Sequence, residues 1–135
     1  MNNFTDSTKT QLAAACILLS VADSDEIFED KELDIINAIL QDFFTIDKKT
    51  ASSLIEKAQN EWKKSTGLFQ FGNQLNEGFS HDDKIDFINC VFEVAYADGE
   101  LHYLEHHTIK KIATILNLHR DEIINVKAEI ENFLD

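Results

Sequence analysis

Proline is absent from this 135-residue chain, and glycine occurs only four times. Proline removes a helix hydrogen bond and glycine weakens helices, so their scarcity allows long uninterrupted helices. No stretch has the composition of a flexible linker or a low-complexity tract. A chain of this length can bury about 70 % of its unfolded surface around one core. The sequence therefore predicts a single all-α domain that spans residues 1–135.

Basic residues are also scarce, because 12 Lys and Arg stand against 25 Asp and Glu, giving a formal net charge of -13. Nucleic-acid backbones and anionic lipid surfaces attract proteins mainly through Lys and Arg. The longest apolar run, Leu12 to Ala22, is too short to span a bilayer, and no basic segment precedes it. We expect a soluble cytoplasmic protein with a protein partner, no nucleic-acid partner and no membrane insertion.

Only two cysteines occur, Cys16 and Cys90, and both stand inside apolar segments. A small buried thiol is the ordinary role for such residues, and so few cysteines agree with a reducing compartment. The sequence gives no support for a disulfide or a redox site.

An internal repeat is the most informative pattern that is present. The chain matches itself without a gap at an offset of 73 positions, and the paired residues include Leu12/Ile85, Leu18/Val91, Ala22/Ala95, Asp25/Asp98, Glu32/Glu105, Ile36/Ile109 and Phe43/Leu116. Such a repeat predicts one helical hairpin used twice, over residues 12–43 and 85–116. Each hairpin alone would leave an apolar face in water, so we expect the two to pack about a pseudo-twofold axis.

Apolar residues at helical spacing predict a bundle of about seven helices. Their approximate ranges are 7–23, 29–44, 50–67, 71–79, 81–98, 102–116 and from 121 onward. The fifth helix is predicted to end at Asp98, with Gly99 as a left-handed cap. Most of the ten phenylalanines are expected in the core. The aromatic residues Trp62, Phe69 and Phe71 are candidates to line an interaction groove.

The two repeated motifs resemble the TerB family, the tellurite-resistance and stress-associated helical domain that also occurs at the N-terminus of DnaJ-like membrane co-chaperones. The resemblance rests on Leu18-Leu19-Ser20-Val21-Ala22-Asp23-Ser24-Asp25 with Glu32, and on Phe92-Glu93-Val94-Ala95-Tyr96-Ala97-Asp98-Gly99-Glu100-Leu101 with Glu105 and the series Ile109, Ile112 and Leu116. It covers about residues 11–127. It implies an all-helical fold of seven helices and no known catalytic activity.

The resemblance also implies a divalent-metal site, which falls here on Asp25, Glu32, Asp98 and Glu105. The sequence departs from the family at Glu26, where glycine is usual, and Asp23 is an alternative to Asp25 in a rearranged bend. Four carboxylates close together repel one another unless a cation binds, and hard oxygen ligands suit Ca²⁺ or Mg²⁺.

A structural role for the two glutamates stays open beside the metal site. A Glu three residues after a helix N-cap can accept a hydrogen bond from the cap's backbone N–H, which is half of a capping box. Glu105 stands in this relation to His102, and Glu32 to Glu29.

Residues 102–106 spell H-x-x-E-H, the string of inverted zinc metalloproteases. The short tail that follows leaves no room for the distal ligand and substrate domain of such an enzyme, so we expect no catalysis. Adventitious zinc at His102, His106 and His107 and an ordinary solvated helix face are the two remaining alternatives, and the solvated face is the default. Two hypotheses follow from the whole sequence. One is a module that binds a divalent metal, and the other is a metal-free acidic adaptor that docks a basic or apolar partner.

Overall fold

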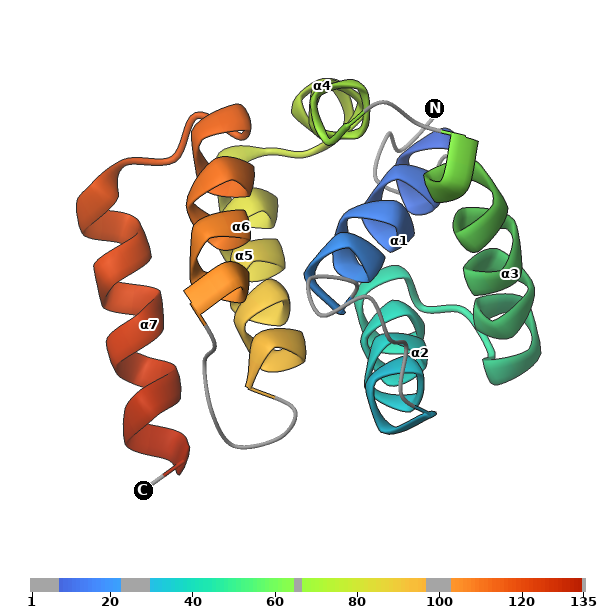
Figure 1. Ribbon diagram of the computed structural model, residues 1–135, viewed down its shortest axis with the longest axis horizontal. Helices are drawn as coiled ribbons and strands as arrows, with labels where there is room; N and C mark the ends of the chain where they lie inside the picture. Colours follow the sequence, from blue (N-terminus) through green and yellow to red (C-terminus); the bar gives the residue numbers. More distant parts are fainter. Residues whose placement is uncertain (1–7, 23–29, 65–66, 97–102, 135) are drawn as a thin grey trace.

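The computed structural model describes residues 8–22, 30–64, 67–96 and 103–134 (Figure 1). Within these ranges the chain forms seven helices and no strand, which confirms the predicted all-α class. The helices are α1 (Thr8–Ala22), α2 (Asp30–Phe44), α3 (Lys48–Lys64), α4 (Phe69–Gly78), α5 (His81–Ala95), α6 (Tyr103–Ile115) and α7 (Arg120–Leu134).

The helices form two groups that α4 joins. Figure 1 shows α1, α2 and α3 on one side, α5, α6 and α7 on the other, and α4 across the top between them. The first helix is the centre of the packing, since α1 contacts α2, α3, α4, α5 and α6.

The burial of α1 explains its central place. Every residue from Ala13 to Ala22 is buried, on all sides of the helix. The one hydroxyl in this stretch, on Ser20, donates a hydrogen bond to the Ile17 carbonyl of the same helix. A helix that is apolar on all its faces belongs inside a protein, where other helices can cover it completely.

The helix bounds repeat at the offset found in the sequence. Helices α1 and α5 begin and end at equivalent positions, and α2 and α6 begin at equivalent positions. The prediction that Leu18, Val91, Ile36 and Ile109 are buried is confirmed, because each is at most 1 % exposed. Beyond the hairpins, α3 packs on α1 and α7 packs on α5, so the similarity extends to a third helix. The pseudo-twofold axis itself stays a prediction.

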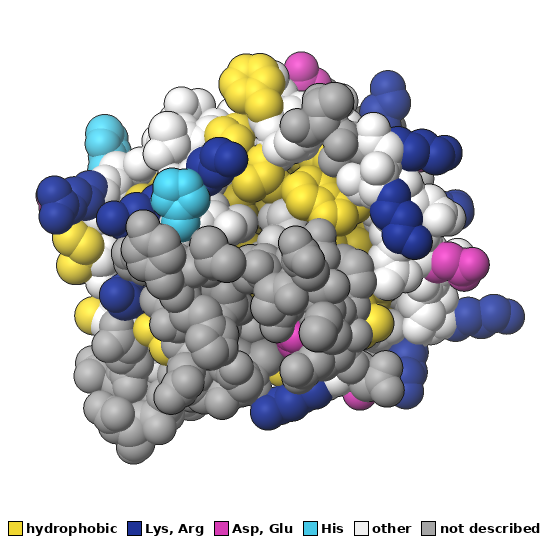
Figure 2. Space-filling view, in the orientation of Figure 1, with side chains coloured by type: hydrophobic (Ala, Val, Ile, Leu, Met, Phe, Trp, Pro, Cys, Tyr) yellow, Lys and Arg dark blue, Asp and Glu magenta, His cyan; other side chains and the backbone are white. Residues whose placement is uncertain are grey.

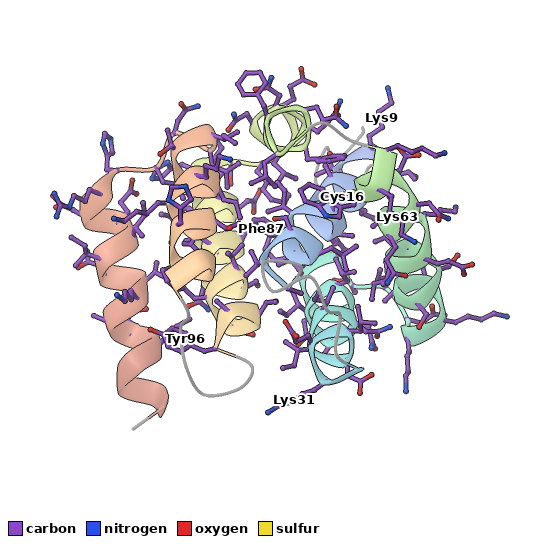
Figure 3. The ribbon with its side chains drawn as sticks, viewed as in Figure 1. Lys9, Cys16, Lys31, Lys63, Phe87 and Tyr96 are labelled. Atoms are coloured by element: carbon purple, nitrogen blue, oxygen red, sulfur yellow. The ribbon has the colours of Figure 1, made fainter. Side chains whose placement is uncertain are left out.

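A cluster of phenylalanine rings joins the two groups of helices. The ring centroids of Phe43 and Phe87 lie 5.8 Å apart, and Phe79 lies 5.4 Å from Phe43 and 5.6 Å from Phe87. Figure 3 shows Phe87 between α5 and the helices of the other group. Such distances are typical of stabilising aromatic pairs, so this cluster fixes α2 against α5.

Two helices end in residues with left-handed backbone. Thr45 follows α2 with φ 54°, and Asn117 lies just beyond α6 with φ 61°. After each of them a backbone N–H donates to a carbonyl five residues earlier, from Ile46 to Gln41 at 3.2 Å and from Leu118 to Ala113 at 3.0 Å. This hydrogen-bond pattern satisfies helix-end carbonyls and turns the chain sharply toward the next helix.

The predicted end of the fifth helix is wrong. Helix α5 ends at Ala95, and Tyr96 is its C-cap with φ -93° and ψ 14°. Ala95 is 1 % exposed, whereas the following Tyr96 is only partly buried. A glycine is a favourable stop signal but not a required one, and this helix ends before it. Asp98 and Gly99 lie outside the described residues.

Candidate functional site

The four predicted metal ligands are only partly described by the structure. Asp25 and Asp98 lie in the two connections that are outside the described residues. Glu105 belongs to α6, but its side chain is outside the description as well. Glu32 lies in the first turn of α2 and is 8 % exposed. The metal site therefore stays a prediction, with one of its four carboxylates placed in a buried position.

Among the described residues, no group of three or more His, Cys, Asp or Glu side chains could hold a metal ion. Several of the described acids at helix starts act as caps. Ser80 and Asp83 form a complete capping box at the start of α5. The carboxylate of Asp47 accepts a hydrogen bond from the Thr50 backbone N–H at 2.7 Å before α3. Hydrogen bonds from the side chain and backbone of Thr50 hold the pKa of Asp47 below its ordinary value.

The start of α7 repeats the spacing that the sequence shows at residues 102–105. The Glu122 carboxylate accepts a hydrogen bond from the His119 backbone N–H at 3.0 Å, and it contacts the His81 ring. These two partners, the backbone of His119 first, lower the pKa of Glu122. A His-x-x-Glu sequence thus caps one helix of this chain, which favours the structural alternative for Glu105.

An acidic groove, which we call the α2/α5 groove, lies between α2 and α5. It has a volume of about 390 Å³ and is lined by Ile39, Asp42, Phe43, Asp83, Asp86, Cys90 and Glu93. Partial burial and, second, the charge of Asp42 raise the pKa of Glu93 above its ordinary value. Like charges therefore meet over an apolar floor, and a basic partner would be attracted to this groove.

A second groove lies between the start of α4 and one face of α6. We call it the α4/α6 groove; its volume is about 780 Å³, and it is lined by Gly67, Leu68, Phe69, Gln70, His107, Lys110, Lys111, Thr114 and Ile115. Figure 2 shows hydrophobic side chains gathered in this region with Lys, Arg and His side chains beside them. No carboxylate lines the groove among the described residues.

The groove differs in two ways from the one predicted from aromatic residues. Of the three candidates, Phe69 lines it and is 67 % exposed. Phe71 is buried at 7 % exposure, and Trp62 is half-buried with its ring centroid 6.1 Å from that of Phe71. Neither lines the groove: the helical turn that exposes Phe69 directs Phe71 inward, and Trp62 belongs to α3 and packs near Phe71.

The positive charge of the groove was also not predicted. Lys110, Lys111 and Thr114 lie three, four and seven residues after His107, so the four residues share one face of α6. That spacing is the signal that the sequence offered, but it is equally typical of an ordinary solvated helix face. Only the position of α4 beside α6 turns the face into a groove wall.

The histidines of the H-x-x-E-H string give no zinc site in the described residues. His102 and the side chains of Glu105 and His106 are outside the description, and adventitious zinc there stays a prediction. His107 is exposed and belongs to the α4/α6 groove.

The cysteines are separate free thiols, as predicted. Burial and, second, the charge of Glu61 raise the pKa of Cys16 to about 12. Its thiol lies 3.6 Å from the Ala58 carbonyl of α3, on the side of α1 that faces α3 in Figure 3. Burial and nearby carboxylates, that of Glu93 foremost, raise the pKa of Cys90 to about 12. Neither thiol is a nucleophile at neutral pH, because only the thiolate reacts.

In the part of the chain that is described, no helix combines the length and the apolar character needed to cross a bilayer. No curated protein and no solved structure matches the chain. The family model described as "Tellurite resistance protein TerB" matches residues 11–128, which includes both hairpins and both grooves. The chain therefore belongs to the TerB family.

Proposed function

We propose that this TerB-family chain is a non-enzymatic, stress-associated binding domain whose two acidic bends hold a divalent cation, Ca²⁺ or Mg²⁺. The observation that carries the proposal is the equality of the two bends. Helix α1 ends at Ala22 and α2 begins at Asp30, and the equivalent bend runs from Ala95 to the start of α6 at Tyr103. Both bends therefore have the same length, with an Asp at the same place.

The glutamates support the same proposal. Glu32 and Glu105 are the third residues of α2 and α6. Glu32 is 8 % exposed in the first turn of α2. Two equal bends, each with one Asp and followed by the Glu of the next helix, would supply four carboxylates, whose oxygens a hard cation prefers.

Thermal unfolding in the presence and absence of metal tests the proposal. An ion that binds only the native state should stabilise it by about 2.7 kcal/mol at a hundredfold excess over Kd. We expect Ca²⁺ or Mg²⁺ to raise Tm, chelator to reverse the rise, and Asp98→Asn with Glu105→Gln to abolish it. A matched control replaces the exposed Glu56 and Glu77 by Gln, which removes the same charge elsewhere.

The capping alternative gives a different result in the same assay. If Glu105 only caps α6, Glu105→Gln should change Tm little, because Gln also completes a capping box, whereas Glu105→Ala should lower Tm equally with and without metal. A Tm that ignores millimolar Ca²⁺, Mg²⁺ and Mn²⁺ would exclude the metal site.

A second candidate function is the metal-free acidic adaptor, and the α2/α5 groove favours it. A cationic peptide with an apolar side chain would relieve the repulsion between Asp42 and Glu93 over the floor formed by Ile39 and Phe43. We expect such a peptide to bind less tightly as salt rises, and less tightly to Asp42→Asn with Glu93→Gln than to the Glu56 and Glu77 control. Equal binding by both variants would refute the adaptor site.

Duplex DNA should not be retained at 0.15 M salt, because its phosphates would meet a surface of the same charge.

A further inference from the structure

The α4/α6 groove is held in one shape by close contacts between its two walls. Gly72 of α4 faces Ile115 of α6, and a Cβ atom added at Gly72 would lie 2.0 Å from the Ile115 Cγ2 atom. Only glycine therefore lets the two helices approach this closely. The Asn76 side-chain amide also donates a hydrogen bond to the Ile115 carbonyl at 2.8 Å. A groove that is fixed before binding loses less conformational entropy when a ligand enters.

The groove offers an apolar contact that the fold itself does not use. Phe69 is 67 % exposed, and Ile124 is the other large hydrophobic residue that is strongly exposed among the described side chains. Beside Phe69, the wall of the groove includes the apolar residues Leu68 and Ile115. An aromatic side chain beside a preformed groove is the type of residue that contributes most to binding a partner.

The charge of the groove is opposite to that of the whole chain. Lys110, Lys111 and His107 line it, in a protein with a formal net charge of -13. Neither lysine forms an ion pair with a described carboxylate. Charges elsewhere on the protein are largely screened beyond about 8 Å at physiological salt, so the local lysines determine what binds here.

From these observations we propose that the α4/α6 groove docks an acidic peptide segment of a partner protein, anchored by an apolar side chain. Asp or Glu residues of the segment pair with Lys110 and Lys111, and its apolar side chain packs on Phe69. A duplex nucleic acid does not fit this description, because its charge extends far beyond a short groove on a chain with a formal net charge of -13. The proposal is independent of the metal site and concerns a partner of opposite charge to the one expected at the α2/α5 groove.

Fluorescence anisotropy with a labelled synthetic peptide of about twelve residues, alternating Glu with Leu, tests the proposal. One control peptide replaces Leu by Ser, and another replaces Glu by Lys. We expect the Glu/Leu peptide to bind and both controls to bind at least about tenfold more weakly, because complementary charge and the apolar anchor are both required.

Protein variants locate the binding site. Lys110→Glu with Lys111→Glu should weaken binding by about tenfold or more, and Phe69→Ala by about fivefold or more. The matched control, Lys48→Glu with Lys49→Glu, makes the same charge change at two exposed residues of α3 and should leave affinity within about twofold. Circular dichroism checks that each variant keeps the helical fold. Chelator should have no effect on this binding, so failure of the metal proposal can be told apart from failure of this one.

Three results would overturn the proposal. The first is the absence of peptide binding at 1 mM, which corresponds to a binding free energy of about -4 kcal/mol. The second is an α3 control variant that weakens peptide binding as much as the groove variants do. The third is equal binding of the Leu and Ser peptides. Sedimentation equilibrium adds a fourth. A wild-type dimer that Phe69→Ala converts to monomer would assign the groove to a second copy of this chain instead.

Discussion

The contact between Gly72 and Ile115 gives a stability prediction that can be worked out in two opposing parts. Replacing Gly72 by Ala should favour α4 by about 1 kcal/mol, because alanine is the better helix former. Against this, the new Cβ would lie 2.0 Å from the Ile115 Cγ2 atom, where ordinary contacts are 3.4–4 Å. The γ2 methyl is attached directly to the Ile115 Cβ, so it cannot move without a change of rotamer or a shift of the helix. Overpacking of this kind costs about 1–3 kcal/mol, and so large an overlap belongs at the upper end.

The overlap should therefore win, and Gly72→Ala should destabilise the protein by about 1–2 kcal/mol, equivalent to a fall in Tm of about 3–8 °C. Urea unfolding of the single and double variants isolates the cause. In an Ile115→Ala background the γ2 methyl is gone, and Gly72→Ala should be neutral or stabilising there, with a coupling energy of about 2 kcal/mol. A higher Tm for Gly72→Ala in the wild type, or the same effect in both backgrounds, would refute the reasoning.

Three further predictions concern other parts of the fold. Thr45→Gly should raise the free energy of unfolding in urea by about 1 kcal/mol, since a β-branched residue is strained at positive φ. Asn117→Gly should raise it less, because Asn tolerates this conformation. Equal increases for the two variants would contradict the strain at Thr45. Val91→Asp should abolish the cooperative thermal transition, because an unpaired buried charge costs several kcal/mol, on the order of the whole stability, and a Tm near that of wild type would count against its place in the core. Cys16 and Cys90 should not react with Ellman's reagent at pH 8 in the native protein but should react in urea, and rapid labelling of the native protein would refute this. Because both pKa values are raised from 9.0 to about 12 in the folded protein, the neutral thiols contribute fully to the free energy of unfolding below pH 9.0, and this contribution is lost as the pH rises toward about 12.

The fold could be predicted because its main signal is the spacing of apolar residues. Helix starts at Thr8 and His81 follow from that spacing and from the internal repeat, which ties one helix to another without any knowledge of contacts. The end of α5 could not be predicted in the same way. The Asp98-Gly99 pair is a strong local stop signal, but the helix ends earlier, at Ala95, with Tyr96 as its C-cap.

The α4/α6 groove shows why surfaces are harder to predict than cores. The spacing of His107, Lys110 and Lys111 defines a polar face of one helix, and the exposed Phe69 belongs to another. No periodicity within either helix states that the two will lie side by side. That depends on the contact of Gly72 with Ile115, which joins residues far apart in the sequence. The acids of the two bends were accessible to sequence reasoning because the repeat places them in equivalent positions.

The central position of α1 has a consequence for how the chain is made. A ribosome adds about 5–20 residues per second, and α1 is the first described helix to emerge. Its apolar surface is covered on one side by α5 and α6, which lie late in the sequence. During most of synthesis, therefore, the apolar surface of α1 is not completely covered by other helices of the protein. Once α1 has left the exit tunnel, a chaperone must bind its apolar surface, or α2 and α3 must cover it temporarily, until the second hairpin is made.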